Sequence, residues 1–417
     1  MILAHKIRLY PTKEQAIEFT KACGCARFTY NWALDEWKKM YDAHKSNPTF
    51  PKPNANLLKK KFNSIKSEQF PWVYDSPKDA NQRAFTNLNN AFQMFFKGIS
   101  DYPVFKKKNN KMSFYISNDK FSVKDYKIQL PRIGIVEMTE KLRFEGKIKS
   151  AVISKTANKW FVSIAVDVGD EIYKKSKSKI IKNDVLGIDL GLTTFATGSD
   201  SSQVLAPKPL KKHLKQLKRL NRKYSRSKKD SKNREKARMR LAKKHATIAN
   251  IRRDFLHKLT TQICRENQTV VIEDLSVKKM MMKNHHLAQA IGDVGWGEYR
   301  RQMAYKNQIY DANLIVAPPF YPSSKTCSCC GWVDNDLTLE DRTFECKECG
   351  LVMDRDLNAS INLHTLGLKG INACGDETSV VTKDSSLQVL STKQESVVVS
   401  CENVNIIYTD LTQVIRQ

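Results

Sequence analysis

The sequence lacks any long apolar run. None of its hydrophobic stretches approaches the roughly 18 residues that a membrane-spanning helix needs. Its first residues, MILAHKIRLYPTKEQ, also lack the apolar core of a secretory signal peptide. No internal repeat is evident. We therefore expect neither a membrane span nor secretion, and a reducing cytoplasmic setting.

Acidic residues are scarce relative to basic ones. Of 417 residues, 71 are Lys or Arg and 43 are Asp or Glu, so the formal net charge is +28. Such a surplus repels itself in a compact fold unless a polyanion offsets it. Ribosomal and membrane-surface proteins are also basic, but nucleic acid is the partner that we expect. Hydrophobic residues make up 41%, which indicates a mostly globular chain of two or three domains.

The ten cysteines stand in a chain without a secretion signal, so we expect metal ligation and no disulfide framework. Four have the spacing Cys-x2-Cys-x15-Cys-x2-Cys, which is typical of a zinc ribbon: Cys327, Cys330, Cys346 and Cys349. Gly331 and Gly350 follow the two pairs and let the backbone turn around the metal. Cys329, inside the first pair, is not expected to bind. Because four thiolates close the coordination shell, we predict one structural Zn²⁺ without a hydrolytic role.

The apolar pattern changes along the chain. From about residue 15 to 100 apolar residues recur at helical spacing. Residues 103–180 alternate and are rich in Val, Ile, Phe and Tyr, which predicts an antiparallel β-barrel or sandwich. From residue 185 a strand hairpin, helices and further strands alternate, which indicates an α/β domain with a central sheet. After about residue 376 the periodicity is lost, and we expect a tail.

Lys and Arg are concentrated between residues 208 and 244, where they number 18 against two acids. Leucines recur there at helical spacing, so we expect a helical hairpin with an apolar seam. A separate amphipathic helix is expected to follow at 250–267. A charge run is often only a solvated face, but this excess favours salt-sensitive contact with phosphates. A second basic stretch is YPVFKKKNNK, residues 102–111. The candidate phosphate contacts are Lys106, Lys107, Lys211, Lys212, Lys215 and Arg219.

Several carboxylates stand where a charge needs a partner. Asp189 follows Ile188 in an apolar strand, Glu273 ends the apolar run VVIE, and Asp354 and Asp356 adjoin the helix after the ribbon. Each alone could be a capping or hydrogen-bonded residue. Together, carboxylates at strand ends and on a packed helix could hold two Mg²⁺ ions about 4 Å apart for phosphodiester hydrolysis. Combined with the positive charge, this set predicts a nuclease.

Five segments resemble successive motifs of the TnpB (OrfB) proteins of bacterial insertion sequences, which are relatives of the type V CRISPR effector nucleases. They are GIDLGLTTFAT, VIEDLSVKKM, GWGEYRRQMAYK, FYPSSKTCSCCGW and CKECGLVMDRDLNASINL. KIRLYPTKEQ, ARFTYNWAL and YPVFKKK resemble that family's N-terminal segments, so the resemblance spans about residues 1–376.

The resemblance implies an α/β multidomain fold. An N-terminal helical and β-barrel (wedge-like) lobe would precede an RNase H-like nuclease domain of the RuvC type with an inserted zinc ribbon. The expected limits are 1–15 and 103–180 for the β-barrel, 16–102 for a helical recognition domain, 181–322 and 353–375 for the nuclease domain, 323–352 for the ribbon and 376–417 for a tail.

The resemblance also implies catalytic acids in the order Asp, Glu, Asp, which fall on Asp189, Glu273 and Asp356. The Asp-x-Asn-Ala pattern selects Asp356 and leaves Asp354 as a helix-start residue or as a residue that contacts the metal ligands. Two catalytic Mg²⁺ ions (or Mn²⁺), a guide RNA from the element's end and a double-stranded DNA target are implied, for a monomer acting at the nucleoid of a prokaryotic cytoplasm. A short target-adjacent motif would be read by the N-terminal lobe. The residues there with side chains suited to base edges are Lys78, Asn81 and Gln82.

Two other functions compete with an RNA-guided endonuclease. A guide-directed repressor that has lost its nuclease should have lost at least one acid, and all three are present. A transposase, or its accessory protein, is the other alternative. A strand-transfer enzyme of the DDE type would end its acid set with Glu on a helix, and a tyrosine-dependent enzyme would need a His-hydrophobe-His pair. His285 and His286 are adjacent and would point apart on a helix.

Overall fold

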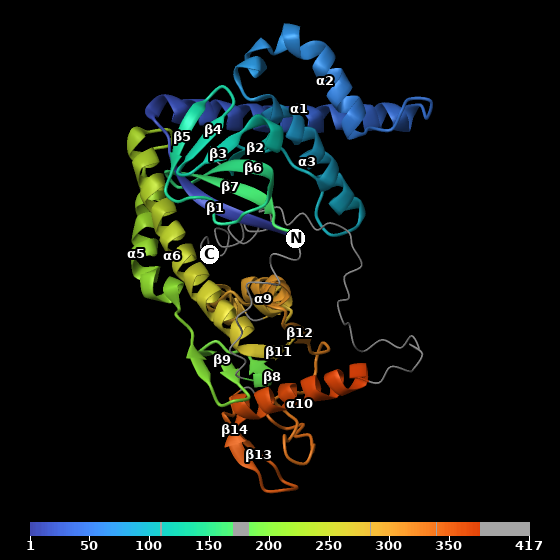
Figure 1. The fold of residues 1–417 in the computed structure, drawn as a ribbon, viewed down its shortest axis with the longest axis vertical. Helices are drawn as coiled ribbons and strands as arrows, with labels where there is room; N and C mark the ends of the chain where they lie inside the picture. Colours follow the sequence, from blue (N-terminus) through green and yellow to red (C-terminus); the bar gives the residue numbers. More distant parts are fainter. Residues whose placement is uncertain (109–110, 170–182, 284, 339, 376–417) are drawn as a thin grey trace. The chain divides into compact units, whose positions relative to one another are not determined.

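The computed structural model describes residues 1–108, 111–169, 183–283, 285–338 and 340–375 (Figure 1). The described residues form two units, 1–169 and 183–375. The predicted tail, 376–417, and the predicted domain boundary at 180/181 lie outside the described residues. No described helix is long and apolar enough to cross a lipid bilayer.

The described part of the first unit holds a seven-stranded antiparallel sheet and three α-helices. Its elements are β1 (Ile2–Tyr10), α1 (Lys13–Ser46), α2 (Ala55–Gln69), the 3₁₀ helix η1 (Pro71–Asp75), α3 (Lys78–Phe96), β2 (Met112–Ser117), the 3₁₀ helix η2 (Asn118–Lys120), β3 (Ser122–Lys124), β4 (Lys127–Leu130), β5 (Gly134–Met138), β6 (Lys147–Thr156) and β7 (Lys159–Asp167).

The strand order of this sheet is β2-β6-β7-β1-β5-β4-β3. The first strand of the chain therefore lies between β5 and β7, more than 120 residues away in sequence. Among the described residues β2 and β3 are the two ends of the order, so the ladders form an open sheet, and closure into a barrel stays a prediction.

The helices of the first unit are built around aromatic side chains. Helix α1 starts at a capping box, in which the Thr12 side chain accepts from the Gln15 N–H and the Gln15 side chain accepts from the Thr12 N–H. Phe85 and Phe92 on α3 are buried in the core between α1, α2 and α3, whereas Phe96 on the same stripe is 71% exposed. The aromatic stripe is thus mainly core.

The described part of the second unit holds a five-stranded sheet, the helices around it and a small two-stranded ribbon. Its elements are β8 (Asn183–Asp189), β9 (Thr194–Gly198), β10 (Gln203–Leu205), α5 (Pro209–Arg226), α6 (Lys232–Glu266), β11 (Asn267–Ile272), α7 (Val277–Lys283), α8 (His285–Val294), α9 (Trp296–Tyr310), β12 (Asn313–Val316), β13 (Thr343–Glu345), β14 (Val352–Asp354) and α10 (Arg355–Gly375).

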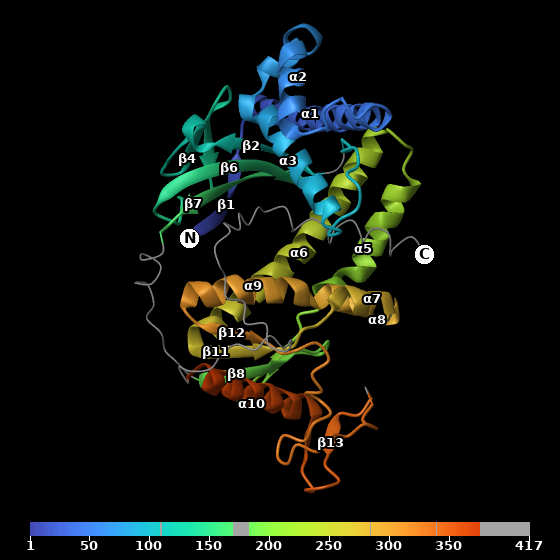
Figure 2. The same cartoon turned by 90° about the vertical axis from the view of Figure 1, so that its right-hand side faces the viewer.

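The five-stranded sheet has the order β10-β9-β8-β11-β12. Strands β8, β9 and β10 are antiparallel, and β11 is parallel to both β8 and β12. Figure 2 shows the sheet between α9 and α10. Strand alternation explains the two layers, because Leu186 and Ile272 pack in the core with α6 and α9, whereas Val185 and Val271 pack with Leu363 of α10.

The basic segment forms the predicted hairpin, but its second helix is longer than expected. Leu210 and Leu217 of α5 pack against Ile248 of α6 in the predicted apolar seam. Helix α6 then continues without a break to Glu266, so the separate helix expected at 250–267 was wrong. Residues 232–266 contain neither Gly nor Pro, so nothing in the chain ends the helix before the strand begins.

Candidate active site and metal centre

Two of the predicted acids lie side by side at one end of the central sheet. Asp189 is the last residue of β8, and Glu273 directly follows the last residue of β11. These strands are parallel with Ile188 opposite Ile272, so the acids are the next pair in register, on strands about 4.8 Å apart. Both belong to the strand face that α10 covers, because residues two apart on a strand share a face.

The third acid arrives on α10 because a glycine lets that helix approach the sheet closely. A Cβ at Gly187 would collide with the backbone of Ser360 and His364. Gly187 lies two residues before Asp189, on the same face of β8. Asp356 lies four residues before Ser360, one helical turn toward the start of α10. The packing at Gly187 therefore brings Asp356 over the strand end that carries Asp189.

The electrostatics show that the three carboxylates interact. Burial, then Glu273 and Asp356, raise the pKa of Asp189 well above its usual range, and Arg355 partly offsets this. Burial and Asp356 also raise the pKa of Glu273, while a hydrogen bond from the Ser323 hydroxyl lowers it. Asp189 and Glu273 held this way favour a proton or a bound cation.

Asp354 and Asp356 have different surroundings. The exposed Asp354 accepts a hydrogen bond from the Leu357 N–H at 2.9 Å, as a helix-capping residue does. Asp356 is only 25% exposed, pairs with Arg355 at 3.2 Å and acts electrostatically on Asp189. The geometry therefore favours Asp356 as the third acid and a capping role for Asp354.

The four predicted cysteines are gathered at a single point. Their sulfur atoms all lie within 4.8 Å of one another, with Cys327 3.6 Å from Cys349 and Cys330 3.5 Å from Cys346. Sulfurs around a tetrahedral zinc, each bonded at about 2.3 Å, would lie roughly 3.8 Å apart. Within the described ranges these thiols are the only group of three or more potential metal-binding side chains that converge so tightly.

The backbone around the cysteines repeats the same turn twice. Gly331 N–H donates to Cys327 O and Gly350 N–H donates to Cys346 O, each at 3.0 Å. Both glycines have positive φ, +81° and +72°, which is the conformation that glycine adopts without strain. The exposed Cys329 lies outside the converging group. The thiol geometry and this turn pattern fit one structural zinc ion.

The candidate phosphate contacts of the hairpin are on its surface. Lys211, Lys212, Lys215 and Arg219 are all exposed on α5. In the first unit Lys106 and Lys107 are both exposed, and the Lys106 ammonium lies 3.8 Å from the centre of the Tyr30 ring. The hairpin therefore presents its charges to solvent, and Lys106 is engaged within its own unit.

The proposed base-reading residues lie at the start of α3, with unequal exposure. Lys78 is exposed and Gln82 is partly exposed, but Asn81 is only 6% exposed. A buried amide is not presented to a base edge, so burial leaves Lys78 and Gln82 as the accessible members of this set. Sequence periodicity did not separate Asn81 from its neighbours because a single polar residue barely alters an apolar pattern.

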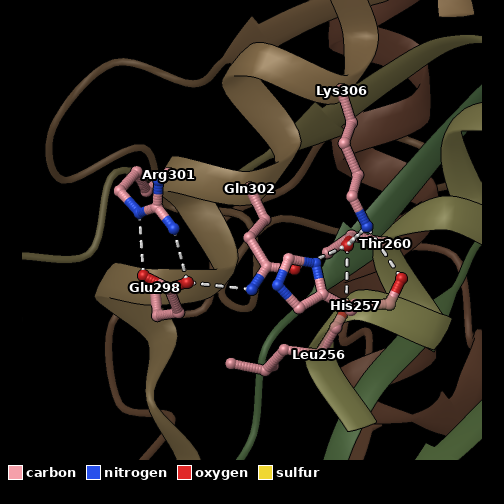
Figure 3. Close-up of polar contacts among 7 residues, drawn as sticks. All are labelled: Leu256, His257, Thr260, Glu298, Arg301, Gln302 and Lys306. Carbon is pink, nitrogen blue, oxygen red and sulfur yellow. Dashed lines mark hydrogen bonds and ion pairs between the residues drawn. The ribbon is translucent and has the colours of Figure 1, made fainter. Parts of the chain in front are cut away.

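A buried lysine in the GWGEYRRQMAYK segment has a structural role. Lys306 of α9 donates to His257 O and Thr260 Oγ1 of α6, each at 2.7 Å (Figure 3). It also donates to Thr261 Oγ1 at 2.7 Å. Burial lowers its pKa to about 8. All three ammonium protons have acceptors, so Lys306 joins α6 to α9 and has no proton free for chemistry elsewhere.

Sequence reasoning missed two polar contacts to the candidate site. Ser323 donates its hydroxyl proton to Glu273 Oε1, and Arg355 pairs with Asp356. Arg355 could have been suspected from its position beside the acid. Ser323 carried no such signal, because serines are common in loops and its partner lies 50 residues away.

Three family descriptions match parts of the chain: "Probable transposase" at residues 163–284, "Cas12f1-like, TNB domain" at 296–363 and "Helix-turn-helix domain" at 1–46. The last match covers β1 and the single continuous helix α1. A Streptomyces pristinaespiralis protein named "Putative RNA-guided DNA endonuclease" is 34% identical over 94% of this chain and 96% of its own. The Escherichia coli protein "Putative RNA-guided DNA endonuclease InsQ" is 30% identical over 89% and 94%.

The fold is also similar to a solved structure. The protein in the "Cryo-EM structure of the Cas12f1-sgRNA-target DNA complex" matches with a TM-score of 0.53 and 14% identity, over 87% of this chain and 98% of that one. This similarity shows a shared α/β architecture.

Proposed function

Because this chain belongs to the TnpB (OrfB) family, whose curated relatives are named as RNA-guided DNA endonucleases, we propose that it cleaves DNA under the direction of a guide RNA. Asp189, Glu273 and Asp356 are the proposed catalytic acids. The observation that carries the proposal is their origin in three elements, β8, the end of β11 and α10, packed around one end of one sheet.

The proposed nuclease domain is RNase H-like and of the RuvC type. Support comes from a five-stranded sheet with three antiparallel strands followed by two parallel ones, and from helices on both faces. In this proposal residues 181–322 and 353–375 form the domain, and 323–352 form a ribbon inserted between β12 and the acid-bearing helix. For the first unit we propose a wedge-like β-domain, 1–15 and 103–180, and a helical recognition domain, 16–102.

The proposed cofactor is a pair of Mg²⁺ ions, with Mn²⁺ as a substitute. Carboxylate oxygens are the donors that these hard cations prefer, whereas thiolates suit zinc, so the two donor sets of this unit fit different metals. Bound cations would supply the charge that activates water and neutralises the leaving oxygen of the phosphodiester. The protein's own part is to hold three carboxylates together at one end of the sheet, where their burial and mutual repulsion favour a bound cation.

Guide RNA and target DNA are the proposed partners, consistent with the net charge of +28. The hairpin residues Lys211, Lys212, Lys215 and Arg219 would contact phosphates, as would Lys107. Lys78 and Gln82 would meet the target-adjacent motif. Phosphate contacts position a nucleic acid without reading its sequence, so base pairing with the guide would supply specificity for the target.

The test is cleavage by a complex purified with its own RNA. The protein is expressed with its native locus, the bound RNA is sequenced, and the complex is challenged with a plasmid library randomised beside a matching target. Depletion of one adjacent motif, with loss of depletion in Asp189→Ala, would support the proposal. Asp254→Ala, an exposed aspartate of α6, is the matched control. Target binding without cleavage by the unaltered protein would identify a repressor instead.

The nucleic-acid surface has a separate test. Changing Lys211, Lys212, Lys215 and Arg219 together to Gln should weaken RNA binding. The slope of log affinity against log salt should fall by up to about 3, at roughly 0.7 per lost contact on single strands. Replacing Lys78 and Gln82 with Ala should instead change the preferred adjacent motif. An unchanged slope or an unchanged motif would remove those residues from the proposal.

A further inference from the structure

The segment that enters the ribbon, residues 323–328, is hydrogen-bonded to two of the three acid-bearing parts of the candidate site, Glu273 after β11 and helix α10. We call it the ribbon root. At its first residue, Ser323 is 2% exposed and donates its hydroxyl proton to Glu273. Its other end consists of Cys327, one of the four clustered cysteines, and Ser328. Its backbone is hydrogen-bonded to α10 at Ser323, Thr326 and Ser328.

Two asparagines of α10 hold the root. Asn358, fully buried, donates to Thr326 O at 2.7 Å and accepts from the Ser328 N–H at 3.0 Å. One turn later, Asn362 donates to Ser323 O at 2.8 Å and to Thr326 O at 2.6 Å. These bonds satisfy backbone groups that ladders or water satisfy elsewhere, and buried bonds of this kind are costly to leave unmade.

Asn358 holds the backbone on both sides of a zinc ligand. The carbonyl that it binds belongs to the residue before Cys327, and the N–H belongs to the residue after it. Cys327 itself is 1% exposed and lies 3.6 Å from Cys349. The position of one thiol is therefore linked through a single side chain to the helix that carries Asp356 two residues earlier.

The two faces of α10 divide these contacts. At 100° per residue, Asp356, Ser360 and Gly367 lie within about 40° of one another on the face toward the sheet. Asn358 lies roughly 160° and Asn362 roughly 120° from Asp356 around the helix axis, on the side toward the root. The helix is thus seated on the sheet by one face and fastened to the ribbon root by the other.

We infer that Ser323, Asn358 and Asn362 are positioning residues through which the thiol site orients the catalytic carboxylates. Ser323 orients Glu273 directly, and the two asparagines hold α10, and with it Asp356. This inference rests on the proposed function. It makes the ribbon a brace for the carboxylate site, since partners that orient metal ligands typically change metal affinity by about 10–100-fold.

The first measurement is Mn²⁺ binding to the zinc-loaded full chain, followed by electron paramagnetic resonance without nucleic acid. Ser323→Ala and Asn358→Ala should each weaken Mn²⁺ binding by about 10-fold or more. Ser323→Thr, which keeps the hydroxyl, should restore it. Asn307→Ala is the matched control, because Asn307 is also buried in this unit but bonds only within α9, to Met303 O.

The second measurement is release of zinc to a chelator, by colorimetry. Asn358→Ala should speed release several-fold, whereas Ser323→Ala should leave it unchanged, because Ser323 does not flank a cysteine. Wild-type Mn²⁺ affinity in both alanine variants would overturn the inference. An equal loss in Asn307→Ala would show a general stability effect and overturn it as well. If the Asp189→Ala variant binds Mn²⁺ as tightly as the unaltered protein does, the proposed function itself fails.

Discussion

The second unit holds two clusters of potential metal ligands that differ in how completely the protein assembles them. The four thiols converge within 4.8 Å on two hairpin turns that lie close in sequence. The three carboxylates are separated by 84 and 83 residues in the chain, and the neighbouring carboxylates raise the pKa of Asp189 and Glu273. Neutral thiols can be packed together without a cation, whereas carboxylates at close range repel.

Under the proposed function, this difference separates a site that serves stability from a site that serves turnover. A closed set of four thiolates has no open position and serves folding. A set of carboxylates under mutual repulsion is less stable when empty, but it leaves room for water and substrate. Active sites commonly keep such unfavourable arrangements at the expense of stability. Four predictions follow this contrast, in order of decreasing effect.

Removing any one carboxylate should abolish cleavage. Asp189→Ala, Glu273→Ala and Asp356→Ala should each reduce cleavage of a matched supercoiled plasmid by roughly 10³-fold or more. A double variant should lose little beyond a single one, because ligands of one metal pair act as a unit. Guide and target binding, measured in parallel by gel shift, should persist. Full cleavage by Asp189→Ala or Glu273→Ala would end the nuclease assignment.

Removing zinc should mainly lower the stability of the folded protein. Cys327→Ser or Cys346→Ser should lower zinc content below one ion per chain. The midpoint of thermal unfolding should fall by about 5 °C or more, at roughly 2–4 °C per kcal/mol for a domain of this size. Cys329→Ser is the control, since this cysteine lies outside the thiol cluster, and it should retain one zinc. Full zinc loading in Cys327→Ser would contradict the assignment.

Neutralising Asp189 should stabilise the protein when divalent cations are removed. Because the pKa of Asp189 is raised in the folded protein, this residue contributes favourably to the free energy of unfolding only at low pH, where it is protonated. That contribution is lost as the pH rises through the pKa that Asp189 has in the folded protein. At pH 8 in a chelator selective for Mg²⁺, Asp189→Asn should therefore melt a few degrees above the unaltered protein, roughly 2–4 °C.

One condition should remove this difference in melting temperature, and a second should reverse it. Near pH 4 the gain should vanish, because Asp189 is then protonated in the folded protein too. With saturating Mg²⁺ the unaltered protein should become the more stable one, because the variant lacks a ligand. Calorimetry across pH, with and without Mg²⁺, measures both. A gain that persists unchanged in Mg²⁺ would argue against a metal at Asp189.

Asp354→Ala should give the smallest effect. It removes the acceptor for the Leu357 N–H at the start of α10, so a fall of about 2–4 °C in the unfolding midpoint is expected. Cleavage should stay within several-fold of the unaltered protein. An inactive Asp354→Ala beside an active Asp356→Ala would show that Asp354 is the third acid.

The same contrast explains what the sequence could predict. The cysteine cluster is local, so spacing and two glycines were enough to identify it. The candidate acids could be picked out at two strand ends and a helix start, but spacing alone did not show that they meet. The resemblance to a family was needed to choose Asp356 over Asp354. The α/β class was also predictable from alternating patterns.

Contacts between distant segments were not predictable. Ser323 meets Glu273 across 50 residues, and Asn358 meets Thr326 across 32. Neither pair has a pattern of its own, because each is created by packing that the whole domain determines. Burial of Asn81 escaped prediction for a similar reason. The continuous α6 was missed because the end of a charge excess was interpreted as the end of a helix.

Two glycines at the contact between α10 and the sheet restrict the helix to one packing position. Gly187 of β8 receives the helix backbone at Ser360 and His364, and Gly367 of α10 receives the side chains of Val185 and Val271. Sliding the helix by one turn, about 5.4 Å, would bring a larger side chain into each of these spaces. The two glycines therefore fix the position of α10 along the strand. The spacing between Asp356 and the carboxylates at the strand ends is therefore set partly by residues that carry no functional group at all.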